Sequence, residues 1–149
     1  MGMTDDRGFL ERRDDLRVPT DEVEVTIYLI DGSQLSGVVF ADPAEPDPST
    51  AVLELLASPE PLLRFRSSFD EFLLVGKGSI ESVLIEGVEP TTSARCFVAT
   101  LSGHRFVGGI PGQLQEERLS DAVQLPWIRV YTERGTLQVR SERVLWIKT

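Results

Sequence analysis

Two segments of the chain, 71 residues apart, carry the same pattern of a strand, a glycine turn and a second strand. They are Val25–Gly37 (VTIYLIDGSQLSG) and Cys96–Gly108 (CFVATLSGHRFVG). Gly32 aligns with Gly103, the glycines that end the two segments also align, and apolar residues match between them. An internal repeat constrains a fold more strongly than composition does. The sequence therefore predicts two diverged copies of one β unit.

The residues of the first copy explain its pattern. Apolar residues from Val23 to Leu29 alternate with polar ones, which is typical of a half-buried strand. Asp31-Gly32 favours a two-residue hairpin turn of type I′, because both of its central positions need a positive φ. Gly37 stands inside the return strand, where a glycine indicates a bulge or a sharp bend.

Apolar segments near the end of each copy predict further strands. In the first copy we interpret Phe72–Val75 and Ile80–Ile85, which flank Gly76-Lys77-Gly78, as a hairpin. In the second copy we interpret three apolar segments in the same way: Trp127–Tyr131, Leu137–Val139 and Val144–Ile147. Between the repeated hairpin and the later strands of the first copy, the proline-rich segment 42–49 predicts a loop, and Ala51–Leu56 predicts a strand.

We therefore expect a mostly β protein with little helix, built from two tandem, diverged, small bent β-barrel units. The expected boundaries are a charged N-terminal arm at 1–19, a first β unit at 20–88 and a second at 89–149. A chain of 149 residues can bury a core of its own without disulfides.

The charge of the chain is unevenly distributed. The net charge is −9, of which residues 1–90 (nineteen Asp/Glu, seven Lys/Arg) carry −12 and residues 91–149 (five Asp/Glu, eight Lys/Arg) carry +3. This acidity makes nucleic acid an unlikely partner, whereas the opposite signs favour head-to-tail association between chains.

Other features of the sequence exclude several classes of protein. The single cysteine, Cys96, excludes an intrachain disulfide and a thiolate metal site, and no apolar run predicts membrane insertion or a secretory signal. We expect a cytoplasmic protein without cofactors.

The segment Leu29–Gly37 resembles the first motif of the Sm-like fold, and Arg118–Val130 is similar to small bacterial Sm-like domains of unknown function. This resemblance implies a small bent barrel that assembles by pairing edge strands. RNA-binding members of the family use an Asp and an Asn after the bent strand and an Arg-Gly in the second motif. This chain has no Asn, and Glu86 precedes Gly87 where that Arg would stand. The resemblance therefore carries over the fold and not the RNA pocket.

The N-terminal arm resembles the start of a PilZ domain. The segment ERRDDLRVP contains Arg12, and its Arg13 and Arg17 have the spacing with which that family binds the phosphates of cyclic di-GMP. Arginine suits this role because its planar fork gives bidentate phosphate contacts. The family's second motif is incomplete here, because Val52 stands at its glycine position. The simpler interpretation is a solvated charged arm.

No catalytic motif is present. His104 is the only histidine and follows a turn glycine, which favours an ordinary turn residue, and Cys96 is expected to be a buried structural thiol. Gly76-Lys-Gly-Ser lacks the earlier glycine of a phosphate-binding loop. We predict that the protein is not an enzyme and that it has no metal site.

Aromatic and arginine residues cluster near the C-terminal end: Trp127, Arg129, Tyr131, Arg140 and Trp146. Such clusters form protein interfaces or base-stacking surfaces. The simpler interpretation, which we favour, is that both tryptophans lie in neighbouring strands and close the core of the second unit. The favoured function is a non-catalytic protein-interaction or assembly module acting on a protein partner or a second copy. The alternative is a degenerate PilZ-like receptor for a cyclic dinucleotide or an Sm-like RNA-binding protein.

Overall fold

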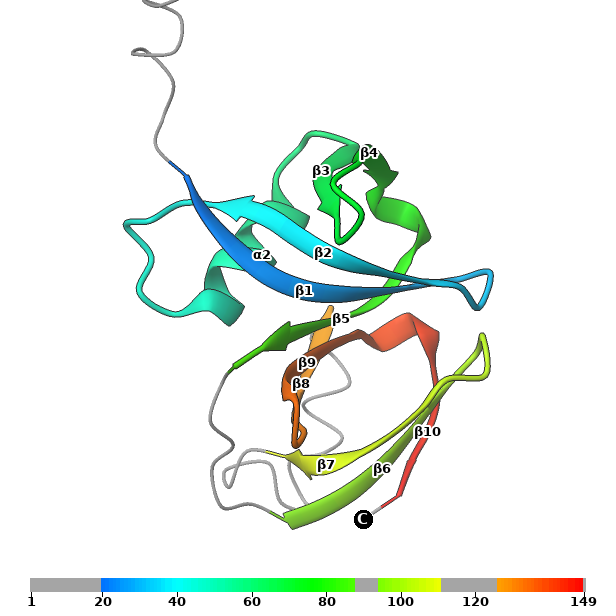
Figure 1. Cartoon of the computed structure of the whole chain (residues 1–149). Coiled ribbons are helices and arrows are strands. Elements are labelled where there is room, and N and C mark those ends of the chain that lie inside the picture. Colours follow the sequence, from blue (N-terminus) through cyan, green and yellow to red (C-terminus); the bar gives the residue numbers. More distant parts are fainter. Residues whose placement is uncertain (1–19, 88–93, 111–125, 149) are drawn as a thin grey trace, which may run out of the picture.

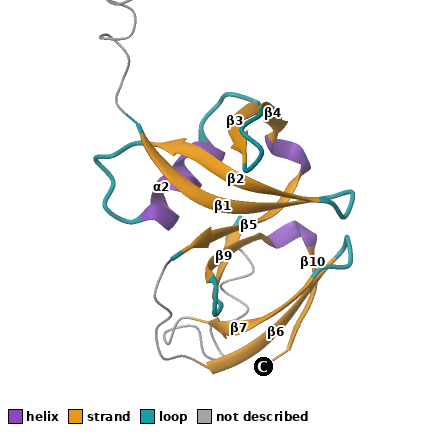
Figure 2. Ribbon diagram, viewed as in Figure 1, coloured by secondary structure: helices purple, strands orange, loops and turns teal. Residues whose placement is uncertain are grey.

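A computed structural model describes residues 20–87, 94–110 and 126–148, and in these ranges the protein is mostly β, as predicted. Ten strands form one antiparallel sheet in the order β10-β6-β7-β8-β9-β5-β1-β2-β3-β4 (Figure 1). The strands are β1 (Asp21–Leu29), β2 (Gln34–Ala41), β3 (Leu62–Ser67), β4 (Phe72–Gly76), β5 (Ile80–Glu86), β6 (Ala94–Thr100), β7 (Arg105–Ile110), β8 (Trp127–Tyr131), β9 (Gly135–Arg140) and β10 (Val144–Lys148). The described ranges also contain one α-helix, α2 (Pro48–Ala57), and two 3-10 turns, η1 (Lys77–Ser79) and η2 (Ser141–Arg143) (Figure 2).

Strands β1–β5 and β6–β10 follow the same path. In each set the first strand pairs with the second and the fifth, the second with the third, and the third with the fourth. We call residues 20–87 the first half and the described residues from 94 to 148 the second half. In Figure 1 β1–β4 lie in the upper part and β6, β7 and β10 in the lower part, with β5 and β9 between them.

The register of pairing also repeats. Leu29 of β1 lies opposite Ile80 of β5, and Thr100 of β6 lies opposite Val144 of β10. Directly after these pairs the register shifts in both sets, so that the next residue of the fifth strand is skipped. The skipped residues, Glu81 in the first half and Leu145 in the second, therefore occupy corresponding positions.

Both hairpin turns have three residues, so the predicted two-residue turn is wrong in type although right in place. The turns are closed by Leu29 N donating to Ser33 O at 2.9 Å and by Thr100 N donating to His104 O at 3.0 Å. Only the last residue of each loop is left-handed, Gly32 at φ +91° and Gly103 at φ +97°. A type I turn followed by one left-handed residue has this form, and it relieves Asp31 of a positive φ.

Gly37 and Gly108 mark the points where each second strand crosses close to the third. A Cβ atom on Gly37 would fall far inside contact distance of the carbonyl oxygen of Arg66. A Cβ atom on Gly108 would meet the carbonyl oxygen of Tyr131 in the same way. Both positions therefore require glycine because the neighbouring backbone passes too close for any side chain.

The strand predicted at Ala51–Leu56 is wrong, because this segment belongs to helix α2. Asp47 caps the helix by accepting hydrogen bonds from Ser49 N at 3.3 Å and from Thr50 Oγ1 at 2.7 Å, and Pro48 occupies the first turn. These are the residues that favour a helix start, and they outweigh the short apolar run. Val52 and Leu56, one turn apart, are buried in the core of the first half.

The predicted hairpin between Phe72–Val75 and Ile80–Ile85 is also wrong. Strand β4 pairs with β3, whereas β5 pairs with β1 and β9. The 3-10 turn η1 carries the chain between them and is held by Ile30 N, which donates to Ser79 O at 2.9 Å. In the second half η2 does the same between β9 and β10.

Two apolar clusters fill the interior, and β5 contributes to both. Val83 and Ile85 belong to the cluster of the first half, whereas Leu84 belongs to that of the second. Successive residues of a strand point to opposite faces, so one strand can serve two cores. The two halves are therefore joined along β5, and the side chains of this strand from Ile80 to Ile85 are no more than 3% exposed.

Candidate functional site

Strand β9 of the second half pairs with β5 of the first half, and we call this contact the internal junction. Five residue pairs form its ladder, from Ser82 opposite Val139 to Glu86 opposite Gly135. The side chains from Thr136 to Val139 are no more than 1% exposed. The fourth strand of one half thus covers the fifth strand of the other.

Arg140, one of the predicted interface residues, lies at this junction. Its Nε donates to the carbonyl oxygen of Ile80 at 2.9 Å and its Nη2 to that of Lys77 at 2.9 Å. Its guanidinium group also lies 4.6 Å from the ring centre of Trp127, which itself packs against the core of the first half. Charge-assisted hydrogen bonds to backbone carbonyls and a cation–π contact therefore hold the two halves together.

Glu81 is a buried carboxylate at the same junction. It is 0% exposed and accepts hydrogen bonds from Ser102 Oγ at 2.6 Å, from Ser102 N at 3.2 Å and from Arg143 Nε at 3.2 Å. Burial on its own would raise the pKa of Glu81, but the hydrogen bonds from Ser102, Thr100 and Arg143 outweigh burial and hold the pKa below its usual value. Glu81, which has no partner in the pairing of β5 with β1, thus links β5 to the β6–β7 turn and to η2.

The other predicted interface residues occupy different places. Arg129 of β8 forms an ion pair at 3.6 Å with Asp47, the cap of α2, and so also joins the two halves. Tyr131 is half-buried opposite Thr136 in the second half. Trp146 lies on β10, is 40% exposed and has the guanidinium group of Arg105 5.6 Å from its ring centre.

The expectation that both tryptophans close the core of the second half is wrong. Trp127 packs against the core of the first half, and Trp146 is exposed. They do not lie in neighbouring strands either, because β6 and β7 stand between β8 and β10. Sequence alone could not show this, since apolar runs give the strands and not their order.

Strands β4 and β10 are the two edges of the sheet. Within the described residues β4 pairs only with β3 and β10 pairs only with β6. Large apolar side chains are exposed on both edges: Phe72 (69%), Leu74 (66%), Leu145 (57%) and Trp146 (40%). Unpaired backbone groups beside apolar side chains form a surface on which another strand can be added.

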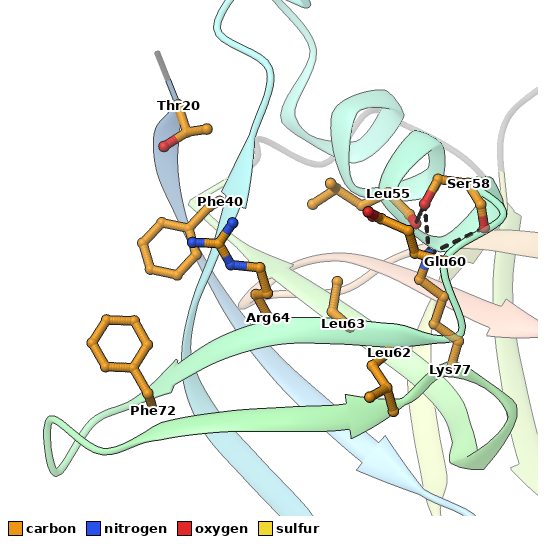
Figure 3. Close-up of a pocket in the computed structure, with 10 residues that line it drawn as sticks. All are labelled: Thr20, Phe40, Leu55, Ser58, Glu60, Leu62, Leu63, Arg64, Phe72 and Lys77. Carbon is orange, nitrogen blue, oxygen red and sulfur yellow. Dashed lines mark hydrogen bonds between the residues drawn. The ribbon is translucent and has the colours of Figure 1, made fainter. Parts of the chain in front are cut away.

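A groove of about 620 Å³ lies beside the β4 edge (Figure 3). Ten residues line it: Thr20, Phe40, Leu55, Ser58, Glu60, Leu62, Leu63, Arg64, Phe72 and Lys77. The guanidinium group of Arg64 lies 6.0 Å from the ring centre of Phe40, whose ring stacks on that of Phe72 at 6.2 Å. The groove extends the apolar surface of the edge and adds two cations to it.

Ser58 and Lys77 form a close pair in this groove, with Lys77 Nζ donating to Ser58 Oγ at 2.6 Å. The same amine donates to the carbonyl oxygen of Ser58 at 3.1 Å, and the hydroxyl donates to Leu55 O at 3.0 Å. Ser58 is the C-cap of α2. A lysine that donates to a helix C-terminus satisfies the last carbonyl groups, so this pair contributes to the C-terminal cap of α2.

His104 belongs to an aromatic cluster, with its ring centre 4.9 Å from that of Tyr28 and 6.3 Å from that of Phe106. Cys96 is buried, as predicted, and burial raises the pKa of its thiol to about 11. Within the described ranges no three His, Cys, Asp or Glu side chains are grouped to hold a metal ion. None of the helices in those ranges has the length and apolarity to cross a membrane.

Arg12, Arg13 and Arg17, predicted to contact a cyclic dinucleotide, lie outside the described residues. Comparison of the chain with family models, with curated proteins and with solved structures gives no match. The resemblances to Sm-like and PilZ domains therefore stay predictions, and the sheet edges are the site that the geometry of this chain supports.

Proposed function

We propose that the protein is a non-catalytic, cytosolic interaction module that binds protein strands at the two open edges of its sheet, β4 and β10. On this proposal the chain is a tandem pair of diverged Sm-like units, joined through one edge contact and open at the other two edges. The observation that carries the proposal is the distribution of polar and apolar residues between the internal junction and the open edges.

Corresponding positions can be compared because the two halves share one register. Val75 and Val139 each stand two residues before the 3-10 turn, so Phe72 corresponds to Thr136 and Leu74 to Gln138. At the closed junction these positions carry polar residues that are 1% exposed, whereas at the open β4 edge they carry apolar residues that are more than 60% exposed.

The same reversal occurs on the fifth strands. Glu81 and Ser82 of β5 are 0% exposed at the junction, and the corresponding residues of β10 are the exposed Leu145 and Trp146. Natural proteins usually protect edge strands with charges, and apolar edges are covered in the working state. Four apolar residues at four open positions therefore favour a bound strand at each edge.

The test is affinity capture from the source cell with edge variants. Leu74→Lys and Leu145→Lys each place a charge on one edge at an exposed position, and Glu133→Lys, in an exposed turn, is the matched control. The proposal expects at least one protein, which could be the chain itself, to be retained by the wild type and the control and lost with an edge variant. Retention that is unchanged in both edge variants, or no retention by the wild type, would refute it.

Titration with cyclic di-GMP and with RNA checks the alternative functions. We expect no RNA binding, because Arg129 and Arg140 are already engaged with Asp47 and with backbone carbonyls at the internal junction. We expect no cyclic di-GMP binding, because Val52 stands at the glycine position of the second PilZ motif. Cyclic di-GMP binding that is lost on Arg13→Ala and Arg17→Ala, or salt-dependent RNA binding through Arg129 and Arg140, would replace the interaction proposal with the corresponding receptor.

A further inference from the structure

We propose that β4 of one chain pairs with β10 of a second copy of the same chain, so that the internal junction is repeated between molecules. This inference rests on the proposed function and names the partner at its two edges. It follows from the strand order, in which the fourth strand of one half already covers the fifth strand of the other. Among the described strands, the two edges left open are the remaining fourth strand, β4, and the remaining fifth strand, β10.

The internal junction fixes the register of the contact between copies. Ser82 lies opposite Val139 and Val83 opposite Gln138. Transferring these pairs to the corresponding residues places Trp146 opposite Val75 and Ile147 opposite Leu74 of the second copy. Lys148 then lies opposite Leu73. The pairing is antiparallel, as in the internal junction.

Charge favours this head-to-tail pairing over pairing of like edges. The first half contains thirteen Asp/Glu and three Lys/Arg, a net charge of −10. Residues 88–149 contain six Asp/Glu and eight Lys/Arg, a net charge of +2. Pairing β4 with β4 would bring two acidic halves together, whereas pairing β4 with β10 brings opposite charges together.

The contact between copies differs chemically from the internal junction. Arg140, which donates to two carbonyl groups of the first half, corresponds to Gly76, which has no side chain to do so. Glu81, which accepts from Ser102, corresponds to Leu145. The contact between copies therefore depends on apolar burial and backbone pairing, and we expect it to be reversible on dilution while the internal junction persists.

Each contact joins a β4 edge to a β10 edge. A linear row of copies therefore has an open β4 edge at one end and an open β10 edge at the other. Such head-to-tail contacts close into a ring when the rotation between copies permits it and otherwise grow into a filament. A second copy paired with β4 also lies beside the groove, because Phe72 of β4 is one of the residues that line it.

Disulfide trapping between two single-cysteine variants tests the register. Leu74→Cys and Ile147→Cys chains are mixed, oxidised and separated under non-reducing conditions. Directly opposed residues of antiparallel strands have Cα atoms about 4.5–5.5 Å apart, within the range that a disulfide spans. The native Cys96 is buried, so the wild type serves as the control for background linkage. We expect a mixed dimer that contains one chain of each kind.

The matched control is Leu73→Cys mixed with Ile147→Cys. Successive residues of a strand point to opposite faces, so this pair is expected not to link. Failure of Leu74→Cys to link with Ile147→Cys, equal linkage of the control pair, or dominant linkage of two Leu74→Cys chains would each overturn the inference. Failure to link together with edge-dependent capture of a different protein would overturn only the identity of the partner, whereas failure of both would also overturn the proposed function.

Discussion

Glu81→Gln measures how strongly the buried carboxylate joins the two halves. The wild-type side chain is 0% exposed and accepts from Ser102 N, Ser102 Oγ and Arg143 Nε. A hydrogen bond to a charged group contributes about 1.5–3 kcal/mol, but Ser102 and Arg143 are partly exposed and can bind water in the variant. We therefore expect a loss of about 2 kcal/mol in the free energy of unfolding, below the simple sum for three contacts.

For a chain of this length about 2 kcal/mol corresponds to a fall of about 6 °C in Tm. Urea and thermal unfolding, followed by circular dichroism and tryptophan fluorescence, measure both quantities. Glu133→Gln is the matched control because it changes the same residue type at an exposed turn, and it is expected to alter stability by less than about 0.5 kcal/mol.

The pH dependence separates the charge of Glu81 from its shape. The pKa of Glu81 is held below the ordinary value of 4.5 in the folded protein, so its charge stabilises the fold above that pH. The stability gap between wild type and Glu81→Gln should be fully present at neutral pH and should close as the pH falls through the lowered pKa. A gap that is absent at neutral pH, or that does not change with pH, would refute the assigned role.

Three further changes test other parts of the structure. Gly37→Ala and Gly108→Ala should each lower the free energy of unfolding in urea by about 1–3 kcal/mol or more, because the new methyl group meets a neighbouring carbonyl oxygen. Gly78→Ala should have no such effect, because the space at its Cβ is open. Equal stability of all three variants would contradict the close approach. Arg140→Ala should cost about 2 kcal/mol by removing two hydrogen bonds across the internal junction, and an unchanged unfolding midpoint would contradict its role there. The thiol of Cys96, with its pKa raised to about 11 by burial, should react with a thiol reagent at mildly alkaline pH only after unfolding, and rapid reaction of the folded protein would contradict its burial.

The sequence predicted the positions at which the two halves correspond. Gly32 and Gly103 stand in equivalent turns, and Gly37 and Gly108 stand at equivalent close approaches. These positions could be predicted because a left-handed φ and a close approach of two backbones both require glycine. The constraint acts at a single position, so it can be recognised in the sequence as a glycine. That the two halves arose by duplication stays a prediction.

The helix and the strand order could not be predicted in the same way. Asp47 and Pro48 carried the signal for the start of α2, but a proline-rich loop followed by a short apolar run also fits a strand. The contact between β5 and β9 joins residues that lie from 49 (Glu86 and Gly135) to 57 (Ser82 and Val139) positions apart in the chain. Nothing in the local pattern of either strand specifies its partner.

Of the residues that the sequence predicts at an interface, only Trp146 lies on an edge strand. The sequence also predicts Trp127, Arg129 and Arg140 at an interface, and the structure places them between the two halves of one chain. The open β4 edge was missed, although the run Phe72-Leu-Leu-Val75 was visible as a strand. Its exposure became apparent only from the strand order, because an apolar run predicts burial unless its neighbours are known.

The solution mass of the chain tests most directly whether the two open edges pair with each other. Sedimentation equilibrium over a range of concentrations should give a wild-type mass above the 16.6 kDa of one chain that rises with concentration. The mass should fall to that of one chain for Leu74→Lys and stay at the wild-type value for Glu133→Lys. A wild-type mass of one chain at every concentration would contradict pairing between copies.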